Sequence, residues 1–204
     1  MRHFDIQKPA LDSTRLMFKE LESDKRSTKI DLGIGIYRDE KGEAPVFKAV
    51  KKAEAILLKT EISKSYKTPA GNSEYCENIL ELVLGKDIIN ERSNKIGAIQ
   101  IPGAGSGLRI AGELIKNKLK NKLISIPDPT WGQQTFMFQK SGLKIIKHSY
   151  YDNTNNFLNF EDMTLDLKRL KSGDALLLHG CCHNPTGADL NIDQWEEVAK
   201  ICKN

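Results

Sequence analysis

Residues 179–187 read His-Gly-Cys-Cys-His-Asn-Pro-Thr-Gly and follow a short apolar run, residues 174–178, that predicts a buried parallel strand. Open α/β sheets bind ligands in loops at the carboxyl ends of their strands, so this loop is a candidate ligand site. Pro185 fixes its own φ and keeps Asn184 out of the α region, while Gly187 permits a tight turn. We therefore expect the Asn184 amide to be held rigidly at the edge of a sheet.

The rest of the chain from Lys95 onward alternates short apolar strands with amphipathic helices. The expected strands are 96–101, 122–126, 143–150 and 174–179, and the expected helices are 107–119, 133–140, 160–170 and a last one from Asn191. This alternation predicts an α/β fold, a mainly parallel sheet with helices on both faces and right-handed crossovers.

The N-terminal part has a different pattern. Residues 31–38 are predicted to be extended, and residues 39–42 to form a turn. Helices are expected over 45–60 and 72–85, with Gly85 closing the second.

The composition is that of an ordinary globular protein. The 204 residues are 39% hydrophobic and 28% charged, which is enough for one domain with a real core. No apolar run approaches the length of a membrane span, and residues 1–8 lack the core of a signal peptide, so a cytoplasmic location and no membrane partner are expected. The net charge of +4 is spread along the chain without interleaved aromatics, so no nucleic-acid binding is expected.

The four cysteines, Cys76, Cys181, Cys182 and Cys202, lack C-x-x-C spacing and are expected to be reduced. The alternation of His179, Cys181 and His183 raises the possibility of zinc. Three alternate positions of one extended segment do not easily surround a tetrahedral ion, so no metal is predicted. Small buried thiols packed behind the loop are expected instead.

Residues 102–107, Pro-Gly-Ala-Gly-Ser-Gly, lie between a predicted strand and a predicted helix. Backbone N–H groups and the positive end of a helix favour a phosphate there. A dinucleotide fingerprint would need a third glycine at the position of Leu108, so a dinucleotide-binding module is disfavoured.

Together with other stretches in the same order, residues 178–187 resemble the aspartate and aromatic amino-acid branch of the class I aminotransferases, which depend on pyridoxal 5′-phosphate (PLP). The supporting stretches are 31–39, 45–54, 102–109 and 128–131, within a resemblance that runs from about residue 5 to the end. It implies the N-terminal half of the aspartate aminotransferase-like fold, incomplete at the C-terminus. Residues 1–45 would form an N-terminal arm and part of the small domain, and residues 46–204 an incomplete large PLP-binding domain.

The resemblance also implies roles for individual residues. Gly103, Ala104, Gly105 and Ser106 would cradle the cofactor phosphate, although the family's usual hydroxyl position is Gly105 here and the hydroxyl follows at Ser106. Trp131 would stack on the pyridine ring and contact the substrate carboxylate. Asn184 would hydrogen-bond the phenolic oxygen of PLP and also reach that carboxylate.

Further positions follow from the same resemblance. Tyr66 would cross a homodimer interface to the partner subunit's phosphate, and the Gly35 backbone would approach the substrate carboxylate. Gln134 departs from the family, where a histidine is frequent. His179 and His183 are expected to be packing or supporting residues rather than proton shuttles.

The implied function is that of a transferase of amino-acid metabolism and biosynthesis, which moves an amino group between an amino acid and a 2-oxo acid. The family's Schiff-base lysine and carboxylate-binding arginine belong to motifs that these 204 residues do not include, so no catalytic residue is assigned. Residues 63–65, Ser-Lys-Ser, are expected to be a solvated loop instead. The chain is thus expected to be a fragment that is inactive and poorly soluble alone. The alternative is a truncated, non-catalytic chain that binds phosphate or PLP weakly, or complements a separately encoded C-terminal half.

Overall fold

The computed structural model describes residues 13–31, 33–66 and 68–203. The chain divides into two compact units, Met1–Ser65 and Tyr66–Asn204. Compactness alone does not identify an arm or a small domain, so the predicted division into residues 1–45 and 46–204 stays a prediction.

The first unit contains α1 (Ser13–Ser23) and α2 (Lys48–Thr60), joined by an irregular segment. The predicted turn at 39–42 is confirmed, because the Gly42 N–H donates to the Asp39 carbonyl at 2.9 Å and Gly42 has a φ of +77°. The predicted solvated loop at 63–65 is also confirmed: it is exposed, and Lys64 pairs with Glu61.

The second unit opens with α3 (Ser73–Leu84), α4 (Lys86–Arg92) and a 3-10 turn, Ser93–Lys95. As predicted, Gly85 ends α3, at a φ of +78°. The helix α4 was not predicted from the sequence.

The strand predicted over 96–101 is wrong. The segment is outside every strand, and its polar groups are used locally: the Gln100 N–H donates to the Ala70 carbonyl at 2.9 Å. The Gln100 Oε1 accepts from the Asn72 N–H at 3.0 Å. The segment is therefore tied to the loop before α3 instead of to the sheet.

The central sheet is three-stranded and entirely parallel, in the order β2-β1-β5. Its strands are β1 (Leu123–Asp128), β2 (Lys144–Ser149) and β5 (Ala175–Leu176). β5 is shorter than predicted, and its last link to β1 is the Leu177 N–H donating to the Ser125 carbonyl at 2.8 Å. A small antiparallel hairpin, β3 (Tyr151–Asp152) with β4 (Phe157–Leu158), occupies the expected polar turn.

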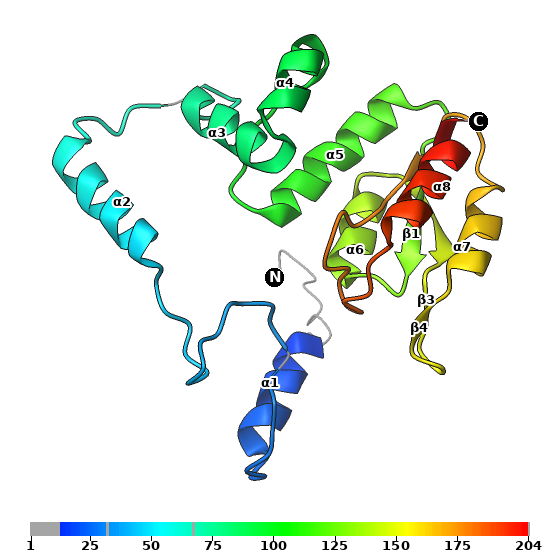
Figure 1. Ribbon diagram of the computed structural model, residues 1–204, viewed down its shortest axis with the longest axis horizontal. Helices are drawn as coiled ribbons and strands as arrows, with labels where there is room; N and C mark the ends of the chain where they lie inside the picture. The colour runs from blue at the N-terminus through cyan, green and yellow to red at the C-terminus, as the bar shows by residue number, and fades with distance from the viewer. Residues whose placement is uncertain (1–12, 32, 67, 204) are drawn as a thin grey trace, which may run out of the picture. The chain divides into compact units, whose positions relative to one another are not determined.

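Helices cover both faces of this sheet, as predicted (Figure 1). One face carries α5 (Ala104–Lys118) and α6 (Gly132–Lys140), and the other carries α7 (Phe160–Leu167) and α8 (Ile192–Lys203). In a strand covered on both faces, successive side chains must point to opposite faces, and the residues at β5 do so. Ala175 and Leu177 pack on the α5–α6 side, whereas Leu176 and Leu178 pack on the α7–α8 side.

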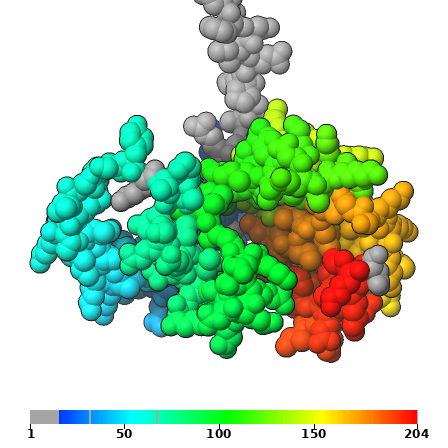
Figure 2. Space-filling model, turned by 90° about the horizontal axis from the view of Figure 1, so that it is seen from above, coloured from blue at the N-terminus to red at the C-terminus, as the bar shows by residue number. Residues whose placement is uncertain are grey.

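The surface of α8, red in Figure 2, adjoins that of α7. Within the described ranges, none of the helices combines the length and the apolar character needed to cross a membrane.

Candidate functional site

The starts of α5 and α6 lie on the same side of the sheet. α5 leads into β1 and α6 leads away from it, so both helices run against the strand direction. Two contacts show that α5 and α6 run in the same direction. Near the start of α5, a Cβ built on Gly105 would lie 3.6 Å from Met137 Cε. One turn later, the Arg109 Nη1 donates to the Lys140 carbonyl at 3.2 Å. Both N-termini therefore point toward the carboxyl edge of β1, where ligands of such sheets bind.

The first turn of α5 contains the residues predicted to cradle a phosphate. Gly103 is the N-cap, and no side chain among the described residues caps this helix. The first intrahelical bond runs from the Gly107 N–H to the Gly103 carbonyl at 3.2 Å, so the N–H groups of residues 104–106 belong to the open first turn. A Cβ at Gly103 would meet no described atom within 4 Å. An anion can thus approach these donors without displacing a side chain.

Trp131 lies between β1 and α6, as the N-cap residue of α6. The exposed fraction of the residue is 37%, so a ligand can reach it. The buried Gln134 follows one turn later, with its N–H donating to the Trp131 carbonyl at 3.0 Å. Thr130 Oγ1 donates to Gln134 Oε1 at 2.5 Å, which anchors the amide beneath the tryptophan.

Gln134 connects the Trp131 turn to the Asn184 loop through His179. The Nδ1 of His179 accepts from the Asn184 N–H at 3.0 Å, so a neutral ring carries its proton on Nε2. That N–H donates to Gln134 Oε1 at 3.2 Å, and the Gln134 amide nitrogen lies 2.9 Å from the same ring atom. Burial lowers the pKa of His179, which favours this neutral form.

His183 anchors the loop through its buried ring. It is 1% exposed and stacks on Tyr150 at 3.9 Å and on His179 at 4.4 Å between ring centroids. Its Nδ1 lies 2.8 Å from Thr186 Oγ1. Burial lowers the pKa of His183 to about 4, so it is neutral at pH 7. The predicted packing role is confirmed.

Asp189 was missed by the sequence analysis, although it holds the same loop. Its carboxylate accepts from the Cys182 N–H at 2.8 Å and from the His183 N–H at 3.0 Å. These hydrogen bonds lower the pKa of the Asp189 carboxyl, which is therefore ionised at neutral pH. The only sequence signal for this role of Asp189 is its position two residues after Gly187, at the end of the loop that it holds.

The structure brings together some of the predicted site residues and leaves others apart. Trp131 and Asn184, both exposed, are joined by the Gln134–His179 link, and the residues 103–106 start the helix that packs against α6. Tyr66 is fully exposed at the beginning of the second unit. Gly35 belongs to the first unit, where a Cβ would meet nothing within 4 Å among the described atoms.

The prediction of buried thiols behind the loop is wrong. Cys181, Cys182 and Cys202 are exposed, and Cys76 is half-buried. The reason is local: residues 180–182 form a bend, with Cys182 at a φ of +53°, that leads the chain out from the sheet edge before His183 returns. Among the described residues, no group of three or more His, Cys, Asp or Glu side chains is arranged to hold a metal ion.

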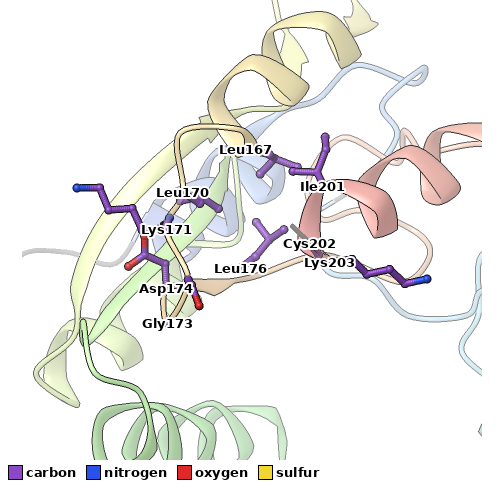
Figure 3. Close-up of a pocket in the computed structure, with 10 residues that line it drawn as sticks. Leu167, Leu170, Lys171, Gly173, Asp174, Leu176, Ile201, Cys202 and Lys203 are labelled. Atoms are coloured by element: carbon purple, nitrogen blue, oxygen red, sulfur yellow. Dashed lines mark hydrogen bonds between the residues drawn. The ribbon is translucent and has the colours of Figure 1, made fainter.

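A cavity of about 270 Å³ lies beside the amino end of β5, away from the carboxyl ends of the strands where Trp131 and Asn184 are found (Figure 3). Its walls come from the end of α7, the loop before β5 and the end of α8, and include Leu167, Leu170, Asp174, Leu176 and Ile201. Because it opens at the amino end of β5, it is on the side where such sheets do not bind ligands. None of the predicted site residues lines it.

Comparison with known proteins identifies the family. A sequence model described as "Aminotransferase class I and II" matches residues 27–204. The chain belongs to this family. It is 41% identical over 180 residues to aspartate aminotransferase of Haemophilus influenzae, covering 88% of this chain and 46% of that protein. It is 36% identical over 197 residues to aromatic-amino-acid aminotransferase of Paracoccus denitrificans, covering 97% and 49%.

Solved structures agree with the sequence comparison. An aromatic-amino-acid aminotransferase from Burkholderia pseudomallei, described as covalently bound to pyridoxal phosphate, matches with a TM-score of 0.89 at 30% identity. The match covers 100% of this chain and 51% of that one. The predicted resemblance and the predicted fold are confirmed, and the chain spans about half the length of the relatives it matches.

Proposed function

We propose that these residues bind PLP in an aminotransferase of the aspartate or aromatic amino-acid type, which moves an amino group between an amino acid and a 2-oxo acid. One observation carries the proposal: hydrogen bonds through Gln134 and His179 connect Trp131 to Asn184 at the carboxyl edge of the sheet. The uncapped start of α5 packs against the same helix that carries Trp131. The family membership and the names of the relatives support the same assignment.

The residues present fit the chemistry of PLP. The phosphate requires backbone donors and a positive helix end, which the first turn of α5 offers at residues 103–106, with the Ser106 hydroxyl beside them. The flat ring requires an aromatic cover, which Trp131 offers, and Asn184 offers an amide donor for the phenolic oxygen. When bound, PLP supplies an electron sink for reactions at the substrate α-carbon.

Substrate contacts are proposed for Gly35, Trp131 and Asn184. At Gly35 a missing side chain lets a carboxylate come close to the backbone. Trp131 would exclude water from one face of the cofactor, and the Asn184 amide would orient the carboxylate. We also propose a homodimer in which the exposed Tyr66 reaches the phosphate held by the partner subunit.

We propose further that a polypeptide made only of these 204 residues does not catalyse transamination. None of its lysines lies in the family's Ser-Lys motif, and Lys64 is in an exposed loop paired with Glu61. The test is an assay of the purified polypeptide with aspartate and 2-oxoglutarate. Measurable turnover would contradict this proposal, and it would equally exclude the alternative of a non-catalytic chain that binds phosphate or PLP weakly or complements a separate half.

Cofactor binding is best tested with pyridoxine 5′-phosphate, because it lacks the aldehyde that would couple to surface lysines. Titration calorimetry should detect binding to the 204-residue chain, with inorganic phosphate as a competitor. N184A should weaken this binding about tenfold, the loss of about one hydrogen bond to the ring. N90A, at an exposed position of α4, is the matched control and should leave the affinity unchanged. Equal affinities for the two variants would contradict the proposed site.

A further inference from the structure

Cys181 and Cys182 place two thiols on neighbouring residues, whose Cα atoms are about 3.8 Å apart across a trans peptide. Both are free and exposed. The other cysteines differ in sequence context: Cys76 in α3 and Cys202 in α8 each stand without a cysteine neighbour. The chain therefore contains one vicinal dithiol together with internal single-thiol controls.

The backbone beneath this dithiol is held in place. Cys182 has a φ of +53°, and its N–H donates to Asp189 at 2.8 Å. The next residue, His183, donates its own N–H to the same carboxylate and buries its ring against Tyr150. Because these contacts fix the turn, a ligand that bridges both sulfurs has little backbone to order, which favours binding.

The two thiols also interact with each other. The Cys181 charge, and hydrogen bonding between the two thiols, raise the pKa of the Cys182 thiol above its ordinary value. Because the two side chains start from adjacent Cα atoms and both are exposed, one small atom can bond to both sulfurs.

We propose that Cys181 and Cys182 form a chelating site for trivalent arsenicals, a class of soft, thiol-seeking compounds. An organoarsenic oxide, R–As=O, condenses with both thiols: two As–S bonds form, two S–H bonds break, and the arsenic oxygen leaves as water. Arsenic stays trivalent, so the reaction needs no oxidant or reductant. Thiolate sulfur is a soft ligand that prefers soft partners, and the fixed second thiol reacts within the same complex.

Chelation predicts a specific resistance to competing thiols. An arsenical on one cysteine exchanges readily with a monothiol, whereas one on two sulfurs is retained about 100-fold more strongly because both bonds must open together. A small dithiol offers the same chelation and should remove it. The site lies just before Asn184, but neither PLP nor Asn184 takes part in the reaction, so this proposal stands or fails apart from the proposed function.

The experiment uses phenylarsine oxide on the reduced 204-residue chain, followed by intact-mass measurement. After a wash with excess 2-mercaptoethanol, one arsenical per chain should remain, and 2,3-dimercaptopropanol should remove it. C181S and C182S should each lose the retained adduct. C76S and C202S, which also leave three thiols, should keep it.

Tryptic mapping supplies a second measurement that does not depend on any variant. Cleavage after Lys171 and Lys200 gives a peptide that contains Cys181 and Cys182 and excludes the other cysteines. The retained arsenical should be found on that peptide. Retention by C181S or C182S, full removal by the monothiol, or an adduct on another peptide would each overturn the proposal.

Discussion

The two faces of the sheet are packed with different chemistry. On the α5–α6 face, here called the apolar face, the buried hydrophobic side chains are Ile124, Ile126, Phe138 and Leu143. Its buried polar side chains, Gln134 and Ser141, carry no titrating group. On the α7–α8 face, Met163, Leu167 and Val198 are joined by buried polar groups. Ser125 Oγ lies 2.9 Å from His148 Nδ1, and His183 is packed against Tyr150.

This difference between the two faces means that one face contributes to stability without buried titrating groups, whereas the other makes stability depend on pH. The apolar face has no titrating groups among its buried described residues, so no protonation of a buried side chain changes its contribution to stability. On the other face, the Nε2 atoms of His148 and His183 are buried and have no hydrogen-bond partner among the described atoms. Protonation of such groups opposes folding, because a buried charge is costly.

The largest expected effect comes from the apolar face. Replacement of Phe138 by alanine should lower the free energy of unfolding by about 3–5 kcal/mol, through lost burial and a residual cavity. Urea unfolding at pH 7 and pH 5 should show the same difference. F136A is the control, because Phe136 is on the same helix but 49% exposed. A comparable loss for both variants would mean that the apolar layer is not packed as described.

The next effect belongs to the polar face and depends on pH. Burial lowers the pKa of His148 from 6.5 to about 4, against the opposing charge of Asp166 and together with His183. The unfolded chain therefore binds a proton between pH 6.5 and about 4 that the folded chain does not. Stability should fall by about 3 kcal/mol as the pH drops through this window, and the His148 contribution should level off below it.

The measurement is urea unfolding across that range for the natural chain and for H148N. The natural chain should show the steeper slope, whatever the stability of the variant at pH 7. Asp166 and Asp189 have lowered pKa values, so their stabilisation is present above their unfolded pKa and is lost at lower pH. Identical slopes for the two proteins would remove His148 as the source.

A smaller effect is expected from the Gln134 link. Q134L removes the amide that holds Thr130 and His179, and should reduce stability by about 1–2 kcal/mol. Amide exchange at Asn184 should quicken because His179 loses its support. Q133L, at the exposed neighbouring position, serves as the control. If exchange at Asn184 were unaffected, the loop would be held by Asp189 alone.

The smallest effect is expected at the surface. Glu113 pairs with Arg109 at 2.7 Å across one turn of α5, with both side chains well exposed. E113Q should cost about 0.3–0.5 kcal/mol at low salt, and the difference should vanish in 1 M salt through screening. A cost that persisted at high salt would indicate a role beyond this ion pair.

Much of the fold was predictable because parallel strands and their covering helices leave strong local signals. The apolar run before His179 and the helical spacing after Gly103 both correspond to observed elements. The strand at 96–101 failed because an apolar extended segment does not reveal its partner, and here Gln100 hydrogen-bonds to residues near Ala70. The helix α4 was missed because it is short and follows Gly85 without an intervening loop.

The site was predictable only in part. Asn184, Trp131 and the residues 103–106 were found through a family motif, and their roles stay predictions. The contact between Gln134 and His179 joins side chains 45 residues apart, which no local pattern encodes, and the Asp189 contacts depend on how the loop turns back on itself. The cysteine error has a similar origin, because the Cys182 N–H donates to the Asp189 carboxylate seven residues later and the bend there turns both thiols outward.

The brevity of β5 has a consequence for how this region can vary. After Leu177 the chain leaves the ladder, so the path from there to Asn184 is steered by side chains rather than by the sheet. Substitutions at positions such as 134 or 189 can therefore shift the reach of the loop while the strand register stays intact. In such a fold, substitutions can change the position of the loop that carries Asn184 without changing the packing of the core.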